Sequence, residues 1–182
     1  MIACIDVDYR TNGDTQREFG VAACLTMETW TSSVPTSEHI AVIEPIEPYV
    51  PGQFYRRELP CILAVLEKIA PEHTPDAIIV DGYVWLPEQK KGLGMHLYEA
   101  LETQIPVIGV AKKTFAGLDS SDDDAQKRVA MVYRGQSKKP LYVTAMGIPV
   151  VEAATHIESM HGDHRLPTLL KQVDQLCRRP LD

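Results

Sequence analysis

Two short apolar runs in the middle of the chain constrain its fold more than any other feature. Residues 77–80 (AIIV) and 107–111 (VIGVA) contain no polar side chain. A strand of a parallel sheet is buried on both faces and carries such a run, whereas a half-exposed strand alternates apolar and polar residues. Because residues 95–103 between them have a helical pattern, the two runs predict parallel strands joined by a helical crossover.

The rest of the chain places this crossover in a mixed sheet. Asn12-Gly13 favours a turn between the first two of three expected strands. Three prolines in PIEPYVPG, residues 45–52, predict a stiff, extended loop. The fold class is therefore α/β: a mixed β-sheet, with three antiparallel strands followed by parallel strands, flanked by α-helices. The other expected elements are strands at 2–8, 18–26 and 39–44, helices at 53–70, 149–161 and 167–178, and a hairpin of 128–134 with 140–146.

Apolar stripes define the buried face of each helix. Pro60 conflicts with the first stripe, because proline inside a helix removes a hydrogen bond; it would start a second segment or kink the first. The expected stripes are Leu59, Ile62, Leu63, Leu66 and Ile69 in the first helix, Val150, Val151, Ala154 and Ile157 in the second, and Leu169, Leu170, Val173 and Leu176 in the last.

Length and composition favour one domain, residues 1–182, with a formal net charge of −7. This charge argues against a protein that coats nucleic acid by bulk electrostatics, but it does not exclude a nuclease. The four cysteines lie singly, three of them in apolar segments, which favours buried thiols in the cytoplasm over disulfides, and no CxxC pair suggests zinc. The chain shows neither a membrane-spanning run nor a secretory signal. Residues 119–124 (DSSDDD) read as a solvated acidic loop.

Two carboxylates stand where an apolar strand would not need them. Asp6 interrupts the strand CIDVD, and Asp81 ends the strand IIVDG. Either acid alone reads best as a turn cap at a half-exposed strand end. If the two strands are neighbours, both carboxylates lie at one edge of the sheet, where open α/β sheets often bind ligands. Each would then need a partner, since burying a lone carboxylate is costly.

Two further acids extend this set. Glu58 lies one turn into the first helix, and Asp174 lies on the last helix beside the apolar stripe. Taken alone, each reads as a solvated residue on a polar helix face. The four together resemble the metal-binding acids of the ribonuclease H-like superfamily. Their chemistry suits Mg²⁺, with Mn²⁺ as a substitute, because hard cations prefer oxygen ligands.

Four longer motifs resemble those of the endonuclease V family, the deoxyinosine 3′-endonucleases. They are IDVDY with Asp6, PYVPGQFYRRE with Glu58, VDGYVWLPEQKKGLGMHL with Asp81, and PVIGVAKKTF with Lys112. KPLYVTAMG and HRLPTLLKQVDQ, which contains Asp174, resemble two more family segments, so the likeness spans nearly the whole chain. The resemblance implies a ribonuclease H-like fold and a metal-dependent endonuclease that acts near deaminated purines in DNA or RNA, as a repair enzyme.

The resemblance also implies roles for single residues. Asp6, Glu58, Asp81 and Asp174 would bind metal, and Lys112 would approach a phosphate oxygen as a point charge. A pair of metal ions about 4 Å apart could activate water and stabilise the leaving oxygen. Lys112 could instead be a lysine that merely extends from a strand end into solvent. His96, also in a family motif, reads better as a packing residue.

A second group would contact nucleic acid, which is the expected partner of a monomer that binds no membrane. Tyr49 could act as a wedge in a base stack, replacing some of the stacking it disrupts, or it could pack on the core of a rigid connector. Glycines would permit close approach of the nucleic acid, or serve as turn residues. Paired basic residues would contact phosphates, or be solvated surface. The predicted contacts are Tyr49, Pro51, Gly52, Gly82, Lys90, Lys91, Lys138 and Lys139, with Arg56-Arg57 as a further pair.

The sequence departs from the family pattern in one motif. The family's His-Pro-Arg is Pro87-Glu88-Gln89, and its second glycine is Val84. At the last motif, Asp174 replaces a family histidine and completes a four-acid set. Two alternatives therefore stay open: a ribonuclease H-like nuclease with another nucleic-acid substrate, and a non-catalytic nucleic-acid-binding protein on the same scaffold.

Overall fold

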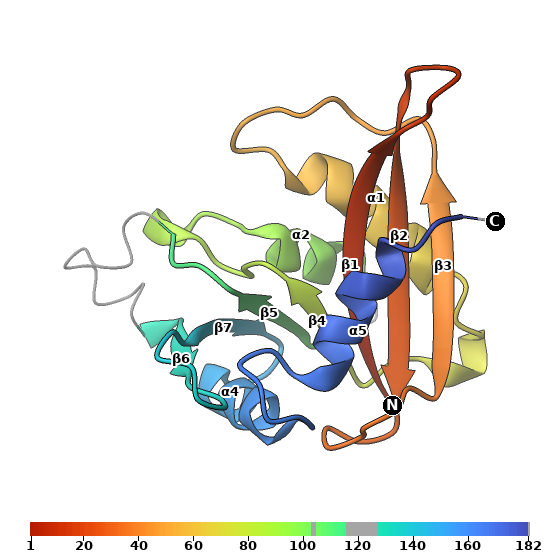
Figure 1. Ribbon diagram of the computed structural model, residues 1–182. Coiled ribbons are helices and arrows are strands. Elements are labelled where there is room, and N and C mark those ends of the chain that lie inside the picture. Colours follow the sequence, from red (N-terminus) through yellow and green to blue (C-terminus); the bar gives the residue numbers. More distant parts are fainter. Residues whose placement is uncertain (103–104, 116–126, 182) are drawn as a thin grey trace.

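The computed structural model describes residues 1–102, 105–115 and 127–181. Its described strands form one seven-stranded sheet in the order β3-β2-β1-β4-β5-β7-β6. The strands β1, β2 and β3 pair antiparallel, whereas β4 pairs parallel with both β1 and β5. A final antiparallel pair, β6 with β7, closes the far edge (Figure 1). The predicted mixed sheet with flanking helices is confirmed.

The elements follow the predicted order, with boundaries that differ by a few residues. The strands are β1 (Ile2–Thr11), β2 (Glu18–Met27), β3 (Ser37–Ile43), β4 (Ala77–Asp81), β5 (Val107–Ala111), β6 (Ala130–Val132) and β7 (Leu141–Met146). The helices are α1 (Tyr55–Leu66), α2 (Leu93–Ala100), α4 (Val150–Ser159) and α5 (Thr168–Cys177), with short 3-10 turns at Pro71–His73 and Pro87–Gln89. The predicted acidic loop, residues 119–124, lies outside the described residues. None of the described helices has the length and apolar character that a membrane span needs.

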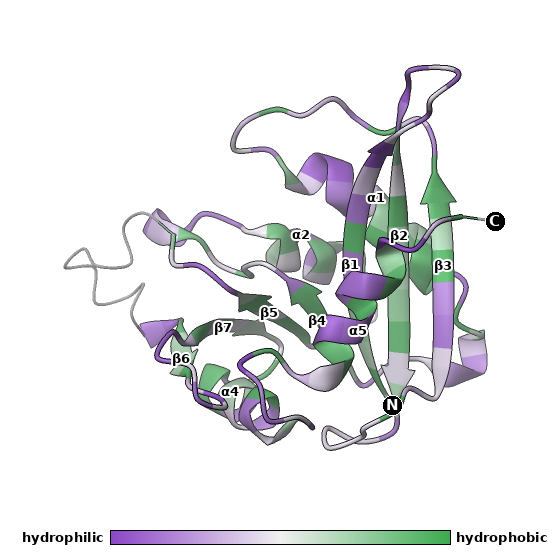
Figure 2. Ribbon diagram, viewed as in Figure 1, coloured by the Kyte–Doolittle hydropathy of each residue, from purple (hydrophilic) through white to green (hydrophobic). Residues whose placement is uncertain are grey.

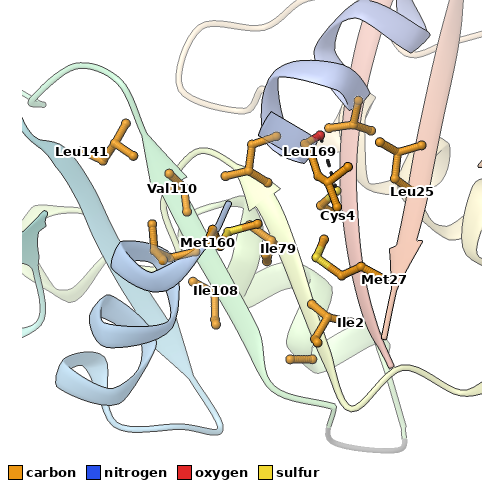
Figure 3. Close-up of a cluster of buried hydrophobic side chains, with 14 of the residues drawn as sticks. Ile2, Cys4, Leu25, Met27, Ile79, Ile108, Val110, Leu141, Met160 and Leu169 are labelled. Carbon is orange, nitrogen blue, oxygen red and sulfur yellow. Dashed lines mark hydrogen bonds between the residues drawn. The ribbon is translucent and has the colours of Figure 1, made fainter. Parts of the chain in front are cut away.

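The sheet separates two apolar layers (Figures 1 and 2). Helices α4 and α5 cover one face, where Leu25, Ile79 and Leu169 belong to the same cluster (Figure 3). Helices α1 and α2 cover the other face, around Ile62 and Ile78. The central strands contribute to both layers because successive side chains of a strand point to opposite faces. The predicted burial of the cysteines is confirmed: Cys4, Cys24, Cys61 and Cys177 are all buried, with free thiols.

Two helix predictions need correction. Pro60 lies inside α1, which continues on both sides of it, so the proline does not start a second segment. The predicted stripe of α4 is wrong for Val151, which is 71% exposed, while Ala153 and Ile157 are buried. The helix covers the edge of the sheet near β6 and β7, and this narrow contact buries fewer positions than the sequence pattern suggested. The predicted stripe of α5 is confirmed, since all four residues are buried.

The unequal lengths of β1 and β4 prepare an open site. The parallel pairing of these strands runs from Ile2 opposite Ala77 to Ile5 opposite Val80. Beyond that level β1 continues to Thr11, paired on its other side with β2. Asp6 and Asp81 are the next residues on their strands, so both carboxylates stand where the sheet opens. The two strands are therefore neighbours, which is the condition for Asp6 and Asp81 to lie close together.

Candidate active site

Asp6 and Asp81 meet at this edge of the sheet. Asp6 shares the face of Cys4, which packs beneath α5. One oxygen of Asp6 accepts a hydrogen bond from the backbone N–H of Val7, at 2.8 Å. Burial and, after it, the charge of Asp81 raise the pKa of the Asp6 carboxyl. The two acids therefore form one electrostatic unit.

Glu58 reaches the same unit from α1. Its side chain is only 6% exposed, so the interpretation of Glu58 as a solvated surface residue is wrong. Burial raises the pKa of Glu58, and the charges of Asp6 and Asp81 raise it further. No hydrogen bond or ion pair to the Glu58 carboxylate occurs within the described ranges. A buried carboxylate next to two others is stable as an anion only when a cation joins it.

Lys112 and Asp174 complete the cluster. The Lys112 ammonium, which directly follows β5, donates to Oδ2 of Asp81 at 2.8 Å and lies 3.8 Å from Oδ1 of Asp174. Arg178, one turn farther along α5, donates to the same Asp174 oxygen at 3.0 Å. Lys112 thus faces into the carboxylate cluster. This position does not fit the alternative interpretation, in which Lys112 merely extends from the strand end into solvent.

Competing effects set the charges of this cluster. Burial, followed by the charge of Asp81, raises the pKa of Asp6 to about 7, although the Val7 N–H and Lys112 act in the opposite direction. Burial also acts to lower the pKa of Lys112, but its hydrogen bond to Asp81 and the nearby carboxylates outweigh this and raise it. The cluster therefore holds Lys112, paired with Asp81, and Arg178, paired with Asp174, against four acid groups.

A small cavity lies between these groups and α5. Its lining combines the polar side chains of Asp6, Asp81 and Lys112 with apolar residues of the sheet and of α5, among them Val110, Leu170 and Val173. Polar groups thus line the cavity on the sheet side and an apolar wall closes it on the helix side. Such a wall lowers the local dielectric constant and strengthens every charge interaction at the site.

The donor set fits a divalent cation in chemistry and charge. Four carboxylates carry up to four negative charges against the cations of Lys112 and Arg178, and hard cations take oxygen ligands. Within the described residues, no three His, Cys, Asp or Glu side chains already stand in a ligand arrangement. The Lys112 ammonium instead lies between Asp81 and Asp174. Asp6, Glu58, Asp81 and Asp174 are the residues that would hold metal here.

The proline-rich loop presents an exposed aromatic pair beside α1. Tyr49 is 60% exposed and Phe54 is 43% exposed, and their rings meet edge to face with centroids 6.4 Å apart. Phe54 in turn meets the Tyr9 ring at 5.8 Å. Tyr49 is therefore not packed on the core, which removes one of the two interpretations of this loop. Pro51 and Gly52 are exposed next to it, and Gly52 has φ +78°, a conformation that favours glycine.

The predicted phosphate contacts are of two kinds. Lys90 pairs with Glu88 at 2.6 Å and Lys91 pairs with Glu99 at 2.6 Å, so local carboxylates already partner both ammonium groups. Lys138 and Lys139 are exposed in the turn between β6 and β7. Gly82 has φ +132°, and no atom lies within 4 Å of the position that a Cβ would take. Open space next to Asp81 is thus available.

Sequence reasoning missed the burial of Arg57, which it paired with Arg56 as a phosphate contact and whose side chain is only 6% exposed. The guanidinium of Arg57 lies 4.4 Å above the Tyr9 ring and donates to Glu18 at 3.4 Å. Within the described structure, the Tyr9 hydroxyl and Arg57 Nε are buried without a hydrogen-bond partner. The available signal was the spacing in β1: Tyr9 shares a face with Ile5 and Val7, which pack under α1.

It also missed two arginines that place α5. Arg134 is buried and donates to the carbonyls of Glu158, Met160, Gly162 and His164. Arg165 donates to the carbonyls of Lys112 and Pro140, which join the segment before α5 to the ends of β5 and β7. Neither contact follows from a local pattern. His96, by contrast, packs as predicted, stacked on Tyr55 with ring centroids 3.6 Å apart.

Comparison with known proteins supports the likeness found in the motifs. Residues 1–175 match the family model for endonuclease V. The chain belongs to the endonuclease V family. Endonuclease V of Streptomyces avermitilis is 32% identical over 191 residues, covering 97% of this chain and 79% of that protein. Endonuclease V of Streptomyces coelicolor is 29% identical over 189 residues, covering 97% and 77%. The chain is therefore a member of a family of nucleases.

Solved endonuclease V structures share its fold. The crystal structure of the Streptomyces avermitilis protein has a TM-score of 0.72 at 26% identity, covering 97% of this chain and 79% of that one. The Bacillus subtilis structure has a TM-score of 0.78 at 19% identity, covering 97% and 78%. Ciona intestinalis endonuclease V, solved with a 23mer DNA containing an inosine followed by a ribo-adenosine, has a TM-score of 0.70 at 16% identity, covering 97% and 83%.

The departures from the endonuclease V pattern lie beside the site. Residues Pro87–Gln89 form a 3-10 turn in which Glu88 has φ 57°. Val84, in place of the second glycine, is fully buried, and its N–H donates to the Thr144 hydroxyl at 2.8 Å. The main chain after Asp81 is therefore anchored to β7, although the family's histidine and arginine are absent from this turn.

Proposed function

We propose that this protein is a divalent-metal-dependent endonuclease that hydrolyses a phosphodiester bond near a deaminated purine, inosine, in DNA or RNA, as a nucleic-acid repair enzyme. The convergence of Asp6, Glu58 and Asp81 with Lys112 at one edge of the sheet carries this proposal. Asp174 joins them from the last helix of the chain. The inosine-containing DNA in the Ciona intestinalis complex supports the choice of substrate.

Each residue of the cluster has a role that its position supports. Divalent cations, with Mg²⁺ preferred and Mn²⁺ as a substitute, would activate a water molecule and stabilise the leaving oxygen. Asp6, Glu58, Asp81 and Asp174 would hold these cations. Lys112, with its pKa raised by the carboxylates, remains a full positive charge that can neutralise a phosphate oxygen. Tyr49 at the exposed loop would replace the stacking of a displaced base.

Cleavage of labelled oligonucleotides tests the proposal directly. DNA and RNA strands with a single inosine would be incubated with Mg²⁺ or Mn²⁺, beside strands with adenosine at that position. The expected products carry 5′-phosphate and 3′-hydroxyl ends, with the cut at the second bond on the 3′ side of inosine. Asp81→Asn should lower the rate more than about a hundredfold, because losing a ligand costs at least as much as losing the group that orients one. A folded protein that binds metal but cleaves neither DNA nor RNA strands would refute the proposal.

One observation favours a second candidate, a nuclease of the same chemistry with another substrate. The turn at Pro87–Gln89 lacks the histidine and arginine of the family motif, and Val84 replaces its glycine. A substrate panel with uracil, xanthine, mismatches, flaps and RNA–DNA hybrids separates the two candidates. Preference for inosine over every other substrate would eliminate the second. Calorimetric titration with Mg²⁺ also tests the non-catalytic alternative. That alternative expects no divalent-metal binding and no effect of Asp81→Asn on nucleic-acid binding.

A further inference from the structure

We propose that the face of β6 and β7 turned away from α4, at the strand ends that also carry the carboxylate cluster, is a stacking platform for single-stranded nucleic acid. This inference rests on the proposed nuclease function and names the form of substrate that the site would accept beside the cut. Tyr142 of β7 and Met131 of β6 are directly opposite each other in the antiparallel pair. Tyr133 follows Met131 by two positions. Together we call Met131, Tyr133 and Tyr142 the stacking platform, or the platform for short.

The platform lies on the face of the sheet that α4 does not cover. Leu141 and Val143 of β7, and Val132 of β6, are buried in the cluster beneath α4 and α5. Side chains alternate along a strand, so Tyr142 and Met131 point to the opposite face. There Met131 is 60% exposed and Tyr133 is 57% exposed. The large side chains of Met131 and Tyr133, at the outermost strand β6, are thus open to solvent.

The platform lies at the same end of the strands as the carboxylate cluster, on the other face of the sheet. Tyr142 is the register partner of Ala111, the last residue of β5, which directly precedes Lys112. On the other side of β5, Tyr83 follows Asp81 by two positions. Its hydroxyl donates to the Lys113 carbonyl at 2.7 Å, and its ring meets Phe115 edge to face at 4.6 Å. Aromatic side chains therefore extend from the end of β4 across to β6.

Positive charges accompany these rings. Lys113 is exposed next to Lys112, and Lys138 and Lys139 are exposed in the turn that joins β6 to β7. Bases of a duplex are stacked on each other and hide their faces, whereas a single strand offers both π-faces and a flexible backbone to such a surface. Exposed rings beside lysines at a catalytic edge therefore fit a single-stranded segment, and a purely apolar protein partner would leave the lysines without partners.

The affinity of the metal-free protein for a single strand tests the platform apart from catalysis. The probe is a fluorescein-labelled oligothymidylate of about 12 nucleotides, within the site sizes of known single-strand binders. Fluorescence anisotropy with the full-length protein in EDTA gives Kd. We expect Tyr133→Ser to raise Kd at least about fivefold, because each stacked base loses its aromatic partner. Val42→Thr is the matched control: Val42 is 53% exposed on β3, at the opposite edge of the sheet, and the change should leave Kd unaltered.

A second readout reports stacking itself. The fluorescence of 2-aminopurine placed in the strand should be quenched on binding to wild type and to Val42→Thr, and less by Tyr133→Ser and Met131→Thr. Both substituted positions are exposed, so folding should survive each change. Equal Kd values and equal quenching for all proteins would overturn the platform. So would sedimentation showing a dimer that Tyr133→Ser dissociates, because a second copy would then cover this face.

The two proposals fail in distinguishable ways. If inosine strands are not cleaved but oligothymidylate binding depends on Tyr133, the platform stands and the repair function does not. If inosine strands are cleaved and Tyr133→Ser alters neither binding nor quenching, the platform fails and the nuclease stands. A platform used in cleavage further predicts that Tyr133→Ser raises KM for substrates with a single-stranded extension and leaves kcat unchanged, since the exposed ring makes no contact with the carboxylates.

Discussion

Asp6 links stability to function at the scale of a single side chain. Its pKa is raised to about 7 in the folded protein, mainly by burial, whereas an aspartate in an unfolded chain has a pKa of about 3.9. Between these values the folded state binds more protons than the unfolded state. The contribution of Asp6 to the free energy of unfolding of the metal-free protein should therefore be highest below about pH 4. It should fall as the pH rises to about 7. Tm measured in EDTA between pH 5 and pH 8 checks this decrease.

Substitution separates Asp6 from the other acids. Asp6→Asn cannot ionise, so it should flatten the pH dependence, raise Tm at pH 8 in EDTA and abolish cleavage. Asp8→Asn is the matched control, because Asp8 pairs with Arg10 at 3.0 Å and is not among the causes of the raised pKa of Asp6. Mg²⁺ should stabilise wild type more at pH 8 than at pH 5, since protons and cations compete for the same oxygens. A variant Asp6→Asn with the full pH slope of wild type would contradict the assignment.

Tyr9 allows a second test at a single residue. Its hydroxyl is buried and finds no hydrogen-bond partner in the described structure, and an unsatisfied buried polar group costs about 1–3 kcal/mol. Tyr9→Phe removes only that group and keeps the ring beneath Arg57 and beside Phe54. We expect the free energy of unfolding to rise by about 1 kcal/mol, measured by urea denaturation. A loss of stability would show that the hydroxyl has a hydrogen-bond partner in solution.

At the scale of elements, Pro60 marks a position where α1 is not optimal. A proline inside a helix lacks the N–H that would donate to the carbonyl one turn earlier, and its ring crowds that turn. Pro60 is exposed, so Pro60→Ala should restore the hydrogen bond without disturbing the core. The expected gain is about 1–3 kcal/mol in the free energy of unfolding, seen as a higher urea midpoint. Leu63→Ala in the same helix is the opposing control and should destabilise, because it removes a packed side chain.

The elements also show how far sequence patterns reach. Runs such as AIIV predicted β4 because a strand buried on both faces must be apolar, and that requirement is local. The pattern could not predict that Glu58 is buried, because this depends on how α1 packs across β1, β2 and β3 and brings Glu58 toward Asp6 and Asp81. It failed for Val151 because helical periodicity does not say how wide the covered face is. The pairing of Lys112 with Asp174 depends on how α5 is placed over the end of β5, which no local sequence pattern encodes.

At the scale of the whole molecule, the site requires both ends of the chain. Asp6 lies on the first strand and Asp174 on the last helix, and α5 packs on β1 and β2. Arg10 strengthens this closure by donating to the carbonyl of Cys177 at the end of α5. The segment before α5 is held just as firmly by Arg134 and Arg165. The position of Asp174 therefore depends on three arginines, of which Arg134 is buried and Arg10 and Arg165 are half-buried.

Arg134 tests this dependence. Its guanidinium donates to Glu158, Gly162 and His164 at 3.2, 3.0 and 3.2 Å, and also to the Met160 carbonyl. Arg134→Met would leave these carbonyls without their donor in a buried setting, so it should cost about 3 kcal/mol or more in the free energy of unfolding. Arg56→Met, at an exposed arginine, should cost little.

Arg134→Lys distinguishes placement of α5 from stability alone. Lysine keeps the charge but has a single ammonium, which cannot reach carbonyls spread around a planar guanidinium. At a temperature where this variant is fully folded by circular dichroism, cleavage should still be reduced, and the Mg²⁺-induced rise in Tm should be smaller than in wild type, because Asp174 is no longer held over Asp6 and Asp81. Full cleavage and a full Mg²⁺ response in a destabilised variant would instead confine Arg134 to the stability of the fold.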